Sequence, residues 1–298
     1  MTFNHKRLAV ALAILSAISI TSPTNTSAID TNVSVNVSVK QPTHIVNWYK
    51  GSDSDIIADG IGKTGGRGMS MSRMAAVMDA QRNLIGIING VQIDSDTTME
   101  DLIVTNDIVK RKISGILRGA KIIEEYERND DEYYVKMRVP IYGSTDSLAS
   151  VIVPELTKNL QHIDFPTAND SELTESEIKK LKNSSYTGVV INAKGLGMES
   201  TFSPVIFDAE DRAIYGIQNL NYDAIIAEGM VSYSNELNDD VTISRAGSNP
   251  LVINAVNVKG GQNSNNKVNP VISVKDAAKL LYANNNTLAG NSQICRPE

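Results

Sequence analysis

The distribution of apolar residues divides the chain into a leader and two longer regions of mixed strands and helices. Residues 8–20 are an apolar run (LAVALAILSAISI) that follows His5-Lys6-Arg7 and precedes Thr26-Ser27-Ala28. A basic start, a short apolar stretch and small residues at its end are typical of a secretory signal peptide. The run is shorter than the about 20 residues that cross a bilayer. We therefore predict that residues 1–28 are a signal peptide, with an uncleaved N-terminal anchor as the alternative.

A strict two-residue alternation follows the leader. Residues 31–39 read TNVSVNVSV, so a strand would carry its valines on one face: Val33, Val35, Val37 and Val39. Three interpretations stay open. The segment begins the next domain, serves as a stiff tether, or adds as a strand to the sheet edge of another protein. Under the last interpretation the four valines are candidate interaction residues.

Residues 29–145 predict an α+β domain, a small sheet packed with two helices. Strands are expected at residues 45–49 and 56–58. A glycine-rich turn then leads into a helix whose apolar positions recur every three or four residues: Met71, Met74, Ala75, Met78, Ile85 and Ile88. We predict that this face packs in the core, because a row of Met is more often packing than a metal or cofactor site. A second helix, capped by Thr97 or Thr98, would have the apolar face Leu102, Val109, Ile113 and Ile116.

The same domain is predicted to end in a β-hairpin. Its strands are Lys121–Arg128 and Tyr133–Tyr142, joined by a polar turn at residues 129–132. In the second strand apolar residues alternate with Tyr134, Lys136 and Arg138, which indicates one buried and one solvated face.

The rest of the chain predicts a linker and a second domain. Residues 146–184 lose the regular pattern and hold Pro154 and Pro166, so we expect a linker with one short helix at about Thr174–Lys182. Strand patterns return at residues 185–298, which predict a strand-rich C-terminal α+β domain. Its last helix is expected to start at Ser273.

Composition narrows the class of protein. The 298 residues are 41% hydrophobic and 21% charged, a balance typical of a folded globular protein. The net charge of -6 argues against a nucleic-acid partner, which usually needs a basic face. A single cysteine, Cys295, excludes an internal disulfide. It is either an idle thiol or pairs with another chain. Since no Cys lies directly after the apolar run at residues 8–20, where a lipid would be attached, no lipid anchor is predicted.

Several segments match a catalytic or ligand-binding motif only in part. Residues 60–65 fit the G-x-G-x-x-G spacing of dinucleotide-binding turns. However, the preceding strand is short and the next suitable acidic residue, Asp94, comes late, so we interpret them as a turn. Asp94-Ser95-Asp96 does not continue as a calcium loop. His44 and His162 follow the leader without metal-ligand or nucleophile spacing. The sequence thus predicts no catalytic, cofactor-binding or metal-binding residues, and no enzyme.

A family resemblance rests on several short segments. In the first region these are Asn47-Trp48-Tyr49, Ala58-Asp59-Gly60-Ile61-Gly62, Asp79-Ala80-Gln81-Arg82-Asn83-Leu84, Ile88-Asn89-Gly90-Val91 and Val139-Pro140-Ile141-Tyr142-Gly143. This region resembles the LPP-twenty lipoprotein family, which is similar to the N-terminal domain of the flagellar H/T-ring assembly protein. The C-terminal region resembles the second half of longer exported relatives, on Tyr186-Thr187-Gly188, Ala193-Lys194-Gly195-Leu196-Gly197 and Asn249-Pro250-Leu251-Val252. The resemblance implies an envelope protein with no known catalytic residues.

These observations lead to one function and one alternative. We expect an exported, non-enzymatic cell-envelope protein that acts through protein–protein contacts, in the assembly of surface or flagellar structures. Its partners would be envelope proteins or a second copy, with no nucleic acid and no transmembrane span after signal cleavage. It would be periplasmic or peripherally associated with the envelope. The alternative is a periplasmic module that binds a small ligand between its two domains.

Overall fold

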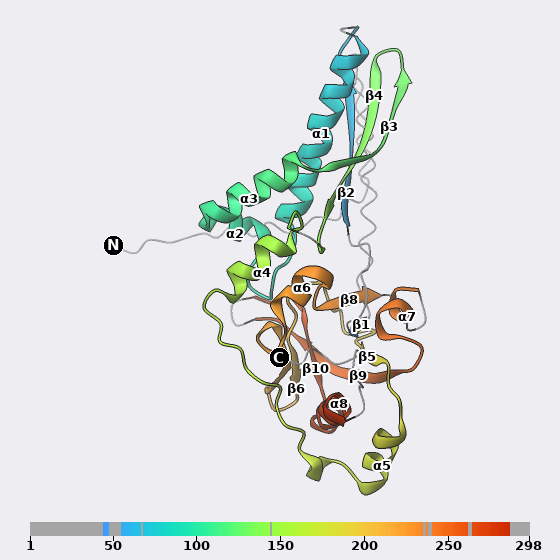
Figure 1. Cartoon of the computed structure of the whole chain (residues 1–298). Helices are drawn as coiled ribbons and strands as arrows, with labels where there is room; N and C mark the ends of the chain where they lie inside the picture. Colours follow the sequence, from blue (N-terminus) through green and yellow to red (C-terminus); the bar gives the residue numbers. More distant parts are fainter. Residues whose placement is uncertain are drawn as a thin grey trace, which may run out of the picture. The chain divides into compact units, whose positions relative to one another are not determined.

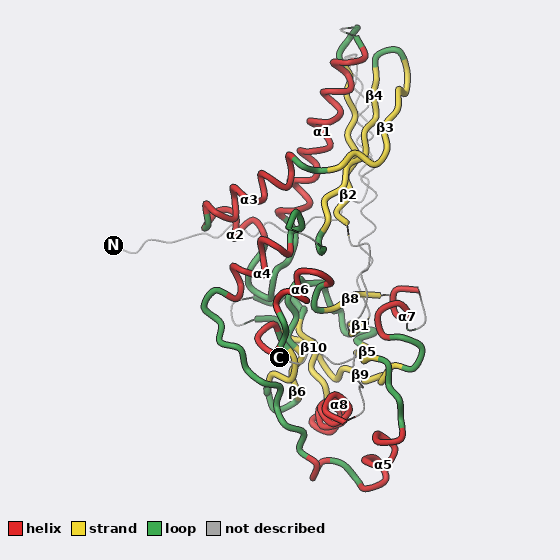
Figure 2. Tube along the Cα trace, in the orientation of Figure 1, coloured by secondary structure: helices red, strands yellow, loops and turns green. Residues whose placement is uncertain are grey.

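The computed structural model describes residues 44–47, 55–66, 68–143, 145–234, 237, 240–261 and 264–286. All of these lie within one compact unit. The predicted signal peptide, the candidate residues Val33, Val35, Val37 and Val39, and Cys295 lie outside the described residues. The fold is α+β, as predicted, and Figure 2 marks its helices and strands.

The first domain is a three-stranded antiparallel sheet with a long helix packed against it (Figure 1). The strands β2 (Asp55–Lys63), β3 (Lys121–Asn129) and β4 (Glu132–Pro140) lie in the order β2-β4-β3. Helix α1 (Met69–Asn89) follows β2, and it contacts β2 and β4. The predicted hairpin is confirmed, because β3 pairs with β4 and alternate residues of β4 are buried (Val135, Met137 and Val139).

The predicted second helix is two helices. Thr98, one of the two predicted caps, forms a capping box with Asp101 at the start of α2 (Met99–Thr105). Asn106 then leaves the helical conformation, with φ −137°, and its side chain accepts hydrogen bonds from Ile108 and Val109. It thereby caps α3 (Asp107–Arg118), which buries Val109 and Ile113. The apolar spacing alone did not reveal this break.

The second domain contains a seven-stranded mixed sheet in the order β7-β6-β10-β9-β5-β1-β8. The strands are β1 (His44–Asn47), β5 (Gly188–Asn192), β6 (Ile206–Asp208), β7 (Ala213–Tyr215), β8 (Val231–Ser234), β9 (Pro250–Lys259) and β10 (Asn269–Ile272). Its helices are α5 (Glu175–Asn183), α6 (Tyr222–Glu228), α7 (Asp240–Ala246) and α8 (Val274–Asn286), with 3₁₀ turns at Asp170–Glu172 and Ile217–Asn219. The predicted C-terminal helix is confirmed, and the Ser273 hydroxyl accepts from the N–H of Asp276 at 3.0 Å at its start.

Two expectations about the elements are corrected. The strand expected at residues 45–49 belongs to the second sheet, where β1 pairs with β5 and β8. A four-residue strand does not specify its partner, so its place in the sequence gave no guide. Residues within the predicted linker form α4 (Ala149–Thr157), which buries Ala149, Val151, Ile152 and Val153 despite containing Pro154. The short helix near Thr174 is confirmed as α5, with a capping box between Thr174 and Glu177.

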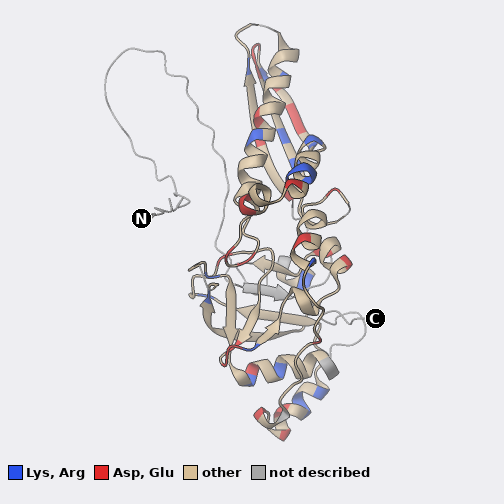
Figure 3. Cartoon of the chain, turned by 90° about the vertical axis from the view of Figure 1, so that its left-hand side faces the viewer, with Lys and Arg blue, Asp and Glu red and all other residues tan. Residues whose placement is uncertain are grey.

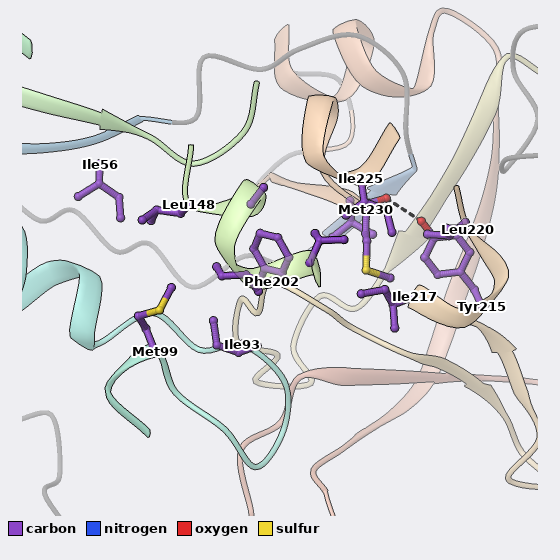
Figure 4. Packing of buried hydrophobic residues seen from close by; sticks show 14 of the residues in the cluster. Ile56, Ile93, Met99, Leu148, Phe202, Tyr215, Ile217, Leu220, Ile225 and Met230 are labelled. Atoms are coloured by element: carbon purple, nitrogen blue, oxygen red, sulfur yellow. Dashed lines mark hydrogen bonds between the residues drawn. The ribbon is translucent and has the colours of Figure 1, made fainter. Parts of the chain in front are cut away.

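One hydrophobic core runs through both domains. Ile93 and Met99 of the first domain and Phe202 and Met230 of the second belong to the same buried cluster, which Figure 4 shows from close by. Backbone hydrogen bonds also connect the two domains. The N–H groups of Phe202 and Ser203 donate to the carbonyl oxygens of Gln92 and Ile93, each at 2.8 Å. At these residues, apolar side chains fill the junction between the domains.

Candidate interaction face on helix α1

Helix α1 has two faces of different character. The face toward the sheet buries a row of residues spaced by four: Ser72, Ala76, Ala80, Leu84 and Ile88. The outer face exposes Met71 (48%), Met74 (55%), Met78 (58%) and Ile85 (43%). Met78 precedes Ala80 by two residues, which at 100° per residue places them about 160° apart around the helix. We call Met71, Met74, Met78 and Ile85 the methionine face.

The sequence predicted that this side of α1 packs in the core, which is wrong for the four residues of the methionine face. Of the other two predicted positions, Ile88 is buried and Ala75 is half-buried beside Gly62. The reason lies in β2. A Cβ added at Gly60 would collide with the backbone of Ala76 and Ala80, and one at Gly62 with the backbone of Ser72 and Ala76. The helix therefore lies close to the strand, and only its small residues fit there. Two glycines facing a row of Ser and Ala were the sequence signal that could have identified the buried face.

The motif Asp79–Leu84 fixes α1 along the outer edge of β2. The Asp79 carboxylate accepts a hydrogen bond from the N–H of Ile61 at 3.1 Å. The Asn83 side-chain amide donates to the carbonyl oxygen of Asp59 at 2.8 Å. These contacts satisfy backbone groups that an edge strand would otherwise present to another strand. The motif residues therefore have a structural role, and they leave the opposite side of α1 in solvent.

Two family models match the chain, one in each domain. Residues 52–139 match the family model described as LPP20 lipoprotein. We call the first domain, which holds this match, the LPP20 domain. Residues 188–295 match the model described as the second domain of Treponema pallidum Tp0624. No curated protein matches the chain. The predicted resemblance is confirmed, and the lipoprotein family indicates an exported protein associated with the cell envelope.

The glycine turn of the LPP20 domain holds a carboxylate of the chain itself. The N–H groups of Gly65 and Gly66 donate to the Asp131 carboxylate at 2.9 and 2.8 Å. Both glycines have positive φ, 63° and 85°, which favours glycine over other residues. The hydrogen bonds from Gly66 and Gly65 hold the pKa of the Asp131 carboxyl below its ordinary value. These hydrogen bonds tie the β2–α1 loop to the β3–β4 hairpin. The turn interpretation of residues 60–65 is corrected, because residues 60–63 continue β2 and the chain leaves the strand only after Lys63.

The outer face of the LPP20 sheet, away from α1, carries interacting polar side chains. The Tyr134 hydroxyl donates to Asp59 at 2.7 Å, and Lys136 pairs with Glu124 at 2.8 Å. Figure 3 shows acidic and basic residues together on the strands of this domain. Burial, with the hydrogen bond to Asp59, raises the pKa of Tyr134 to about 12. Tyr134 is therefore a neutral hydrogen-bond donor at physiological pH. In contrast to this polar face, the methionine face is apolar.

The structure does not bring the sequence-predicted interaction residues into view, since Val33–Val39 lies outside the described residues. His162 is exposed, and no His, Cys, Asp or Glu of the described residues forms a group of three or more that could hold a metal ion. Among the described residues, no helix combines the length and the apolarity that a membrane span requires. The sequence did not predict the exposed apolar face on α1 of the LPP20 domain, which is the candidate interaction face.

Proposed function

We propose that this chain is an exported, non-enzymatic protein of the cell envelope that works by protein–protein contact through the methionine face of α1. The observation that carries the proposal is the exposure of Met71, Met74 and Met78, each about half accessible to solvent on one side of a helix. Met is common on adaptable binding surfaces because its unbranched, polarizable side chain fits grooves of differing shape.

The spacing of the face fits one mode of recognition. Met71, Met74 and Met78 are the i, i+3 and i+7 anchors with which a helix enters an apolar groove of a partner. From Met71 to Ile85 the face is about 21 Å long at 1.5 Å per residue. Arg82 follows Met78 by four residues and so lies on the same side of the helix. Its guanidinium is 3.2 Å from the Asp79 carboxylate. A partner would therefore meet an apolar row that includes one paired arginine.

Separate observations support the process and the non-enzymatic character. The resemblance to the domain of a flagellar assembly protein supports assembly of surface or flagellar structures as the process. The non-enzymatic part is supported by the sequence, where His44 and His162 have no metal-ligand or nucleophile spacing. The alternative, a small ligand bound between the domains, stays a prediction. The apolar packing at Ile93 and Phe202 does not favour it.

In-cell photo-crosslinking tests the proposal. A benzophenone amino acid is placed at Met78, and at Lys194 as an exposed control in the second domain. We expect a defined envelope protein, or a second copy, to crosslink from position 78 and not from position 194. The same product should disappear when Met74→Glu accompanies the probe and persist with Lys182→Glu. Equal products from positions 78 and 194 would contradict a contact at this face.

A further inference from the structure

Apart from Met69, which is half-buried at the start of α1, the methionines of the described residues fall into two groups. Met71, Met74 and Met78 are exposed on the outer side of α1. Met99, Met137, Met198 and Met230 are buried in the core, each at most 2% exposed. The exposed sulfurs are therefore gathered on one face of one helix, rather than scattered over the surface. The buried methionines of the same chain serve as an internal control for the reactivity of the exposed ones.

Exposure decides which thioethers an oxidant can reach. A two-electron oxygen donor such as hydrogen peroxide transfers one oxygen to the sulfur. The O–O bond breaks, an S–O bond forms, the sulfur loses two electrons to the peroxide, and the second peroxide oxygen leaves as water. The product, methionine sulfoxide, is polar where the thioether was apolar. Reaction at the three exposed residues would replace an apolar row by a row of hydrogen-bond acceptors.

The fold has no need of these three side chains. Helix α1 is held by its opposite side, where Ala76 and Ala80 lie against Gly60 and Leu84 is buried. The edge contacts of Asp79 and Asn83 with β2 also lie outside the methionine face. Oxidation can therefore change the polarity of the face without unfolding the domain. Oxidation of the buried group would disrupt the core.

We propose that Met71, Met74 and Met78 are a methionine-sulfoxide modification site whose oxidation by peroxide switches the face from apolar to polar. As a switch of partner binding, this rests on the proposed function. As a modification site it stands on exposure and position alone. The oxidant class is the two-electron oxygen donors, which an exported protein meets outside the cytoplasm.

The site is tested by treating the purified full chain with hydrogen peroxide and following each methionine by peptide mass spectrometry. We expect sulfoxide at positions 71, 74 and 78 to form at least tenfold faster than at 99, 137, 198 and 230. In urea the two groups should react at similar rates, so that the difference is a property of the fold. Equal rates in the folded protein would overturn the proposal.

The polarity switch is tested by retention on a hydrophobic-interaction column. Peroxide should shorten the retention of the wild-type chain and leave that of the triple variant Met71→Leu, Met74→Leu, Met78→Leu unchanged, because Leu keeps the face apolar and cannot be oxidised. The far-ultraviolet circular dichroism of both should stay the same. An equal loss of retention in the triple variant would overturn the switch.

A crosslinking probe at Ile85 separates the two proposals. If peroxide abolishes the crosslink in the wild-type chain and not in the triple Leu variant, the site controls the contact. If selective oxidation and shorter retention are found but the crosslink persists, the modification site stands. Oxidation then does not control the contact, and the switch of partner binding is wrong. If position 85 gives no crosslink even before peroxide, the contact proposed for the methionine face is wrong and the modification site is unaffected.

Discussion

Gly60 of β2 lies directly against the backbone of Ala80 in α1, with no room for a Cβ between them. This contact sets the distance between the helix and the sheet in the LPP20 domain. It also determines which side of α1 is buried, because only small residues fit opposite the glycines. The exposure of the methionine face is therefore a consequence of the packing at Gly60 and Gly62.

The packing predicts opposite effects at two glycines of the same region. Gly60→Ala should lower the free energy of unfolding by about 1–3 kcal/mol, the usual cost of overpacking. Gly86→Ala, in the exposed part of α1 where an added Cβ meets nothing, should raise it by about 0.5–1 kcal/mol. Urea unfolding followed by circular dichroism measures both. The same midpoint for Gly60→Ala and the wild type would show that the contact is looser than the structure indicates.

The hydrogen bonds of Asp131 predict a local change in amide exchange. Asp131→Ala removes the acceptor for Gly65 and Gly66, so the N–H groups of both should exchange faster with solvent. Asp130→Ala, at the neighbouring exposed position of the hairpin, should leave these two rates unchanged. Hydrogen exchange resolved by nuclear magnetic resonance measures them. Unchanged exchange in Asp131→Ala would mean that the carboxylate does not hold the turn.

The lowered pKa of Glu177 predicts that the folded chain loses stability in acid. Hydrogen bonds from the Thr174 backbone and from Lys275 lower the pKa of Glu177 to about 2 from an ordinary value of 4.5. Between these values the unfolded chain binds the proton and the folded chain does not, so stability falls as the pH decreases from about 4.5 to about 2. Above pH 4.5 Glu177→Gln should be less stable than the wild type, and this difference should vanish near pH 2.

Urea midpoints of the two proteins across this pH range test the prediction. Glu175→Gln, in the same first turn of α5, serves as the control. A difference between Glu177→Gln and the wild type that persists at pH 2 would assign its effect to something other than the charge.

The sequence was a good guide where the pattern itself fixes the structure. The β3–β4 hairpin follows from the alternation of apolar residues through Val135, Met137 and Val139. A shift of the strand by one residue would turn these side chains from the core toward the solvent. The capping boxes at Thr98 and Thr174 follow from local spacing that needs no tertiary partner. The α+β class follows from counting such elements.

The sequence failed where a distant contact outweighs the local pattern. On α1 the methionines are more hydrophobic than the alanines, so the apolar stripe indicated the wrong face. The side of α1 that is buried is determined by Gly60 and Gly62, which lie on β2. The partner of β1 and the burial of α4 likewise depend on the second sheet and the shared core. Gly60 and Gly62 were a sequence signal for the buried face of α1, but it can be used only once β2 is known to pack against α1.

The shared core predicts that the two domains unfold together. Phe202 is buried, stacks on Tyr142 with ring centroids 5.6 Å apart, and donates its N–H to Gln92. Phe202→Ala should therefore lower the free energy of unfolding by about 3–5 kcal/mol, as for other large buried side chains. Val252→Ala, at an exposed position of β9, should change it by no more than about 0.5 kcal/mol.

In the wild-type chain, hydrogen exchange should show β4 and β5 losing protection in one transition, because neither domain keeps a complete core without the other. Separate transitions for the two strands would mean that each domain is stable alone and that the contact at Phe202 is only an interface.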